Sequence, residues 1–204
     1  MREDLGWEAA EEEGLRRMYE ELAPHAINEF TAERLKSYYL ANRKLAQPAH
    51  EALSFARSLA TPFPRAAVVF GATTIEVTLK RVLLKPLIYG LVHNDALAEF
   101  IASLSIKHNG GLDPFKDLLE NILQQFAEIE LETFKRDGSG VPIIKEMKDI
   151  QESRNKIIHS AATEFDGLAP LAIDVASTFL NIIFPRLLVR LGLRVDGFLT
   201  IRAQ

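Results

Sequence analysis

The sequence predicts an all-α protein, an antiparallel bundle of helices preceded by an N-terminal helical arm. In most long segments, apolar side chains recur every three or four residues, which is the period of an amphipathic helix. Breaks rich in Pro, Gly or Asp separate these segments, at 61–64, 109–111, 137–140 and 165–167. Alternating apolar and polar residues occur only in the tail, where we expect a small hairpin.

Length and composition favour one domain. The chain has 204 residues, of which 48% are hydrophobic and 25% are charged, values usual for a soluble globular protein with a core. The break at 61–64 is the best boundary, so we expect an arm over residues 1–61 and a helical bundle over residues 65–204. Two small domains are the alternative.

Charge and cysteine content narrow the chemistry. The net charge of −4 does not suggest a broad non-specific nucleic-acid surface, but it is compatible with a small pocket that acts on RNA. The absence of Cys excludes disulfides, thiolate catalysis and Cys-ligated metals. The acidic N-terminus does not read as a signal peptide, and charged residues interrupt the apolar stretches 66–92 and 171–193. We therefore expect no membrane span and a cytoplasmic protein.

Three helical regions are expected in the first half of the chain. Residues 2–22 are rich in acids and have a thin apolar face, which would pack on a partner subunit or on the bundle. Residues 28–60 form the second region, and Pro48 should kink or restart it. Residues 65–92 are apolar on nearly all sides, so this helix should be central, and Pro86 should kink it or begin a following turn.

Within that long helix, Glu76 and Lys80 are one turn apart. Opposite charges at this spacing usually form a surface or rim ion pair, which is the favoured interpretation. The alternative is that Glu76 faces Arg154 from a neighbouring helix and holds its guanidinium in place.

A helix over 95–107, capped by Asn94 or Asp95, should precede one that runs from Asp113 to about Phe134. In the polar loop that follows, Lys135 and Arg136 could guide a phosphate backbone. The favoured interpretation is that they complement a helix dipole. The last elements are a helix over 142–161, a helix over 168–191 that Pro185 kinks, and the tail hairpin.

The helix over 142–161 contains the candidate site. Its apolar seam advances in steps of three and four residues, and Arg154 occupies one seam position. Because an unpaired buried charge is costly, Arg154 should face a partner, a cleft or a subunit interface. Asn155 and His159 are four residues apart and share a neighbouring face. Arginine binds phosphate through a planar fork, imidazole transfers protons near neutral pH, and an amide can orient either group.

This pattern of Arg, a polar residue, three residues and then His, late in a helical domain, resembles the motif of the HEPN superfamily. The matching residues are Arg154, Asn155 and His159, and the resemblance covers residues 65–190. Many HEPN proteins are metal-independent ribonucleases, often toxins or antiviral effectors, and they usually act as dimers whose two motifs meet across the interface.

The resemblance implies that Arg154, Asn155 and His159 are catalytic. Under the alternative interpretation of their ion pair, Glu76 and Lys80 would support these residues. It also implies an RNA substrate, a homodimer, no cofactor, and an antitoxin or regulatory protein as partner. HEPN toxins paired with nucleotidyltransferase antitoxins usually carry a Tyr shortly after the His. Ser160, Ala161 and Ala162 follow here, so we do not infer that particular pairing.

Other site chemistries find little support. The five His residues include no pair three or four residues apart and no completing acid, so we expect no metal site. The segment Gly138-Ser139-Gly140 lacks the lysine of a phosphate-binding loop, and no basic recognition helix is evident.

Three hypotheses therefore remain. The first is a HEPN-like endoribonuclease, and the second is a non-catalytic helical adaptor or regulator in which the motif serves dimer structure. The third is a protein that binds a nucleotide or an RNA end without cleavage. Under a purely structural interpretation, Arg154 would form a salt bridge and His159 would cap a helix.

Overall fold

The computed structural model describes residues 29–107, 116–160 and 165–204, so the expectations for residues 2–22 and for the helix start at Asp113 lie outside it. The regular secondary structure of the described residues is helical apart from one two-stranded hairpin, and the all-α fold class is confirmed. In chain order the elements are a helix over 29–41, α2 (Gln47–Leu59), α3 (Pro64–Val77), the π-helical η1 (Thr78–Leu84), α4 (Lys85–Leu91), α5 (Asp95–Lys107), α6 (Lys116–Ala127), α7 (Ile143–Ser160), the 3-10 turn η3 (Asp166–Leu168), α8 (Ala169–Thr178), the π-helical η4 (Phe179–Ile183), α9 (Phe184–Arg190), β1 (Leu193–Val195) and β2 (Ile201–Ala203).

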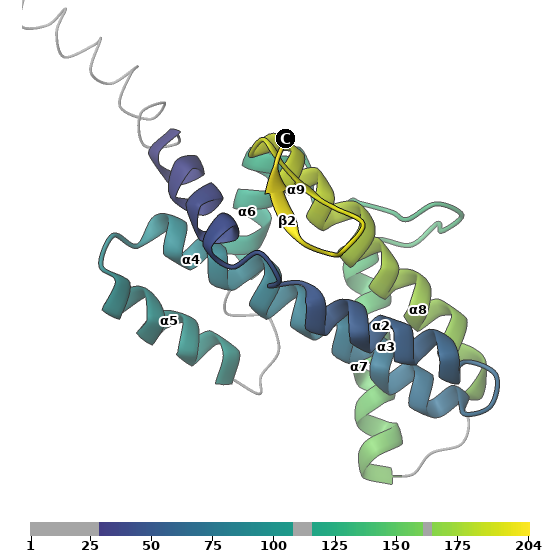
Figure 1. Cartoon of the computed structure of the whole chain (residues 1–204). Helices are drawn as coiled ribbons and strands as arrows, with labels where there is room; N and C mark the ends of the chain where they lie inside the picture. The colour runs from purple at the N-terminus through teal and green to yellow at the C-terminus, as the bar shows by residue number, and fades with distance from the viewer. Residues whose placement is uncertain (1–28, 108–115, 161–164) are drawn as a thin grey trace, which may run out of the picture.

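Two long helical rods, α3–η1–α4 and α8–η4–α9, form the centre of the fold (Figure 1). The first rod packs through α3 against α2, α7 and α8. Gly71 allows the close approach of α3 to α8, because a Cβ added there would lie 2.9 Å from the Cβ of Ala172. The motif helix α7 is thus held against the central rods through α3 and α8.

A π-helical turn precedes Pro86 in the first rod. Proline has no N–H to donate, and its ring clashes with the carbonyl four residues back. The Lys85 N–H bonds the carbonyl of Lys80, five residues back, which widens the turn. The carbonyl of Val82, four residues before the proline, accepts a hydrogen bond from the buried Tyr39 hydroxyl at 2.8 Å. The α-helical segment α4 then begins at Lys85, with Pro86 in its first turn.

The second rod repeats this arrangement before Pro185, where the Phe184 N–H bonds the carbonyl of Phe179. This rod, Ala169–Arg190, is long and apolar enough to cross a membrane by length and composition, with a mean hydropathy of 1.5. However, 56% of the 18-residue apolar stretch within this helix is buried inside the fold. Phe179 and Phe184 are fully buried in the main core. The core thus accounts for the apolar character of this helix.

Residues 29–60 contribute to the same core as the later helices. Leu35, Tyr39 and Leu53 belong to the main hydrophobic cluster, which extends through α3, α7, α8 and α9. The expected restart at Pro48 is confirmed, since α2 begins at Gln47 with Pro48 in its first turn.

Two further helix ends can be compared with the expectations. The Asn94 side chain accepts a hydrogen bond from the Leu97 N–H at 3.0 Å, which confirms the cap of α5. The predicted helix through Phe134 is wrong, because α6 ends at Ala127. After this end, Glu128 has a left-handed φ of 54°, and its N–H donates a hydrogen bond to the carbonyl of Gln124 in α6. Gly usually occupies such a position, but the sequence has no Gly here.

The predicted tail hairpin is also confirmed. β1 and β2 pair antiparallel, with Arg194 opposite Arg202. Leu193 and Ile201 are fully buried, and the Ile201 N–H bonds the carbonyl of Arg43 at 2.9 Å, which holds the hairpin beside the turn at 42–46.

Candidate functional site

The candidate motif lies where α7 leaves the core. Ser153 is the last buried residue of this helix, and most of the side chains after it are exposed. Figure 1 shows the last turns of α7 reaching past α2 and α3 at the lower edge of the view. The end of α7 therefore presents its side chains away from the core.

Arg154 lies at the edge of the buried face and is half-buried. Ser153 takes the buried place at this turn and bonds the carbonyl of Asp149 at 2.7 Å. Because the small hydroxyl replaces the guanidinium in the core, the expected cost of a buried charge does not arise. The Nη1 of Arg154 donates to the Oδ1 of Asn155 at 3.0 Å, and within the described chain no carboxylate forms an ion pair with Arg154.

His159 is exposed one turn further along α7. No hydrogen bond joins it to Arg154 or Asn155 in the described part of the chain. The structure thus brings two of the three motif residues into contact and places the third nearby on the same helix end. Beside them, the apolar side chain of Ile158 has an exposed fraction of 49%.

Glu76 and Lys80 form the ion pair favoured from the sequence, with Nζ and Oε1 2.8 Å apart. The Lys80 side chain is 9% exposed, whereas that of Glu76 is 44% exposed. Among the described residues no ion pair joins Glu76 to Arg154, so the alternative in which Glu76 holds the guanidinium is not observed. Both partners lie on the first rod.

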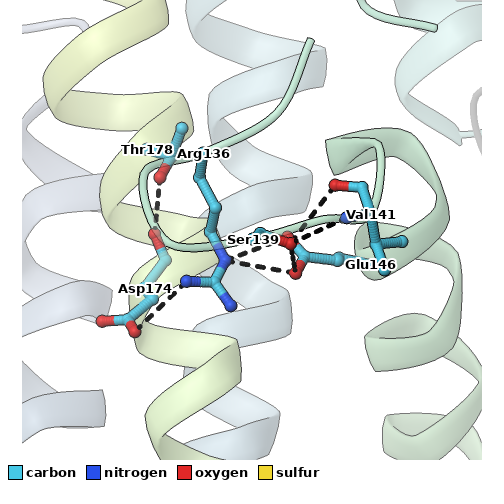
Figure 2. Close-up of polar contacts among 6 residues, drawn as sticks. All are labelled: Arg136, Ser139, Val141, Glu146, Asp174 and Thr178. Atoms are coloured by element: carbon cyan, nitrogen blue, oxygen red, sulfur yellow. Dashed lines mark hydrogen bonds and ion pairs between the residues drawn. The ribbon is translucent and has the colours of Figure 1, made fainter. Parts of the chain in front are cut away.

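A buried polar cluster anchors the start of the motif helix (Figure 2). Glu146 is only 6% exposed, and its carboxylate accepts hydrogen bonds from Arg136 Nε at 3.0 and 3.2 Å and from Ser139 Oγ at 2.7 Å. The same guanidinium lies 3.7 Å from the carboxylate of Asp174 on α8. Arg136 is therefore bound to two acids, which differs from both roles considered for it from the sequence.

A second cluster joins α4 to α5 away from the motif. The Tyr89 hydroxyl donates to Glu99, and Lys85 Nζ lies 3.1 Å from the same carboxylate. These hydrogen bonds hold the pKa of Glu99 below its ordinary value.

Tyr38, on helix 29–41, also has a shifted pKa. Burial, with a smaller effect of the Glu99 charge, raises the pKa of Tyr38 to about 12, so this tyrosine is neutral at physiological pH.

The motif does not line any of the surface hollows described. These hollows have volumes of about 430–520 Å³ and lie beside residues 128–134, between α6 and α9, and between helix 29–41 and α4. Among the described residues, no group of three His, Asp or Glu side chains is placed to hold a metal ion. Among the described residues, most side chains at the motif end of α7 are exposed.

Comparison with family models, curated proteins and solved structures finds no significant match for this chain.

Proposed function

We propose that this protein is a HEPN-like, metal-independent endoribonuclease that acts in the cytoplasm as a toxin or as an antiviral or stress effector. The observation that carries the proposal is the state of Arg154. Its guanidinium contacts a neutral amide and, among the described residues, forms no ion pair with an acid, so it can accept a phosphate. An exposed imidazole lies one turn away.

In the proposed reaction the ribose 2′-OH attacks the adjacent phosphorus, and the bond from phosphorus to the 5′ oxygen breaks. The products are a 2′,3′-cyclic phosphate and a 5′-OH end. Arg154 would stabilise the charge that develops on the phosphate oxygens. His159 would take the proton of the 2′-OH or give one to the leaving oxygen, and Asn155 would orient the guanidinium or the substrate.

A second copy of the chain would complete this site. Catalytic pockets are usually concave, whereas one protomer presents the motif on an open helix end. The exposed Ile158 and the half-buried Ile157 offer an apolar surface for a partner α7 beside the polar residues. A two-fold dimer would then enclose an RNA strand between two copies of Arg154 and His159.

Arg154→Ala and Lys156→Ala, each compared with wild type, test the proposal. Both variants remove one cation from the same exposed helix end. We expect Arg154→Ala to slow RNA cleavage in EDTA by at least about 100-fold, because it removes the group that stabilises the transition state. Lys156→Ala should cleave at close to the wild-type rate. Equal loss in both variants would mean that net charge, and not the motif, supports cleavage.

The same pair of variants separates the ribonuclease from a non-catalytic adaptor. The exposed helix end, with Ile158 among its polar side chains, would also suit a surface that only binds protein. Under that alternative, purified wild type leaves RNA intact, and Arg154→Ala changes the monomer–dimer balance or the melting temperature. Under the ribonuclease proposal, Arg154→Ala also relieves toxicity on overexpression.

A further inference from the structure

The tail hairpin has two arginines directly opposite each other on its outer face. Arg194 pairs in register with Arg202, and both are exposed. Leu193 and Ile201, on the opposite face, are fully buried. Like charges at directly opposed positions destabilise a two-stranded sheet. Asp196 offsets part of this repulsion, since its carboxylate pairs with Arg202 and is also attracted to Arg194. One carboxylate against two guanidinium groups leaves an excess of positive charge, which favours an anionic partner.

Further cations lie beside the hairpin. Arg43 and Lys44 are exposed in the turn at 42–46, which the hydrogen bond from the Ile201 N–H to the Arg43 carbonyl holds against β2. Asp196 pairs with Arg202, with Nε and Oδ2 2.6 Å apart. The same carboxylate is attracted to Arg194, whereas in the described ranges no ion pair neutralises Arg43 or Lys44.

At the tip of the hairpin, Phe198 is 84% exposed. Its loop is nevertheless ordered, because the Asp196 side chain accepts hydrogen bonds from the N–H groups of Phe198 at 2.9 Å and Thr200 at 3.0 Å. The Thr200 bond is the main cause that lowers the pKa of Asp196, and Phe198 and Arg202 add to it. The adjacent Leu199 has a left-handed φ of 56°, which costs roughly 1–2 kcal/mol in an L-residue. A fixed loop therefore presents an aromatic ring to solvent.

We propose that the hairpin and the turn at 42–46 form a binding surface for single-stranded RNA. Phe198 would stack on an unpaired base, while Arg194, Arg43 and Lys44 would contact phosphates, a combination that binds single strands with little sequence preference. The inference rests on the proposed function only for the choice of RNA over DNA.

The net acidity of the chain does not oppose this surface. Residues 1–28 contain eight of the 28 acidic residues but only three of the 24 Lys and Arg residues, so the remaining chain is not acidic. Figure 1 places β2 near the upper end of the view and the end of α7 near the lower end. The hairpin would therefore hold RNA at a distance from the motif, as a separate contact.

Binding of a fluorescein-labelled 2′-O-methyl RNA strand, measured by anisotropy across a salt series, tests the inference. This probe has no 2′-OH nucleophile, so its binding is measured whether or not the protein cleaves RNA. The full chain is compared with Phe198→Ala, with the double variant Arg43→Gln/Arg194→Gln, and with Arg57→Gln as control. Arg57 is an exposed cation on α2 whose side chain bonds Ser177.

We expect Phe198→Ala to weaken binding about tenfold and to remove the preference for a single strand over a duplex of the same length. The double variant should lower the salt dependence by about 1.4 units of the log–log slope, since each phosphate contact on a single strand contributes about 0.7. The control should bind like wild type. A DNA strand of the same sequence should also bind, since stacking and phosphate contacts do not require RNA.

No binding by wild type, or wild-type binding by both hairpin variants, would overturn the inference. If the hairpin variants bind RNA normally but change the mass measured by light scattering, the surface joins copies of this chain and the RNA inference is wrong. Cleavage is assayed separately. A protein that binds through the hairpin but does not cleave would contradict the proposed function and leave this inference intact.

Discussion

Replacing Glu146 with Ala should destabilise the protein more than any surface charge change. The carboxylate is 6% exposed and accepts three hydrogen bonds, two from Arg136 and one from Ser139. Removing one member of a buried ion pair typically costs about 3–5 kcal/mol, because the other charge is left uncompensated. The Arg136 side chain remains 20% exposed and keeps Asp174 at 3.7 Å, so the lower end, about 3 kcal/mol, is expected.

Urea denaturation measures this loss directly. For a chain of this length, about 3 kcal/mol corresponds to a fall in Tm of roughly 6–12 °C. The cost should be similar at low and high salt, since a buried pair is little screened. Glu152→Ala, which removes an exposed acid from the same helix, should stay within about 0.5 kcal/mol of wild type.

A double-mutant cycle with Arg136→Ala identifies the interaction. If the two residues act as a pair, the double variant should cost clearly less than the sum of the single variants. A loss below about 1 kcal/mol for Glu146→Ala, or additive costs in the cycle, would refute the assignment of this cluster as the anchor of α7.

Three further predictions follow from single contacts. Tyr39→Phe should cost about 1–2 kcal/mol in urea denaturation, since the Val82 carbonyl loses its 2.8 Å donor; an unchanged stability would contradict that role. Gly71→Ala should cost about 1–3 kcal/mol, because its Cβ would lie 2.9 Å from that of Ala172, and Ala172→Gly in the same chain should restore part of the loss. The loop hydrogen bonds lower the pKa of Asp196, so its stabilising contribution is present above the unfolded pKa and is lost as the pH falls through the folded pKa. A carboxyl NMR titration should find that pKa below the ordinary value, and Asp196→Asn should remove this part of the acid dependence.

The sequence was informative where one local signal determines the structure. The period of the apolar residues predicted the central rods and α7, and Asn94 predicted a helix start that its side chain indeed caps. The end of α6 was missed because Glu128 adopts a left-handed backbone without a Gly to signal it.

Contacts between distant segments were harder to predict. Glu146 lies on the buried face of α7, and a charge at such a position should have prompted a search for a partner. That partner, Arg136, comes from a loop whose path depends on the whole bundle. At the motif the sequence placed Arg154 in the seam, four residues after Ile150. The position three residues after Ile150 also borders the apolar face, and Ser153 takes the buried place there.

The most direct test of the central proposal is RNA cleavage in EDTA by wild type and His159→Ala, with the mass of each protein measured by light scattering. His159 is exposed, so its replacement should leave the fold intact, and the mass measurement checks the proposed dimer separately. The proposed mechanism predicts cleavage by a wild-type dimer and loss of cleavage by a variant dimer of the same mass. An intact RNA after incubation with folded wild type, or equal cleavage by both proteins, would contradict it.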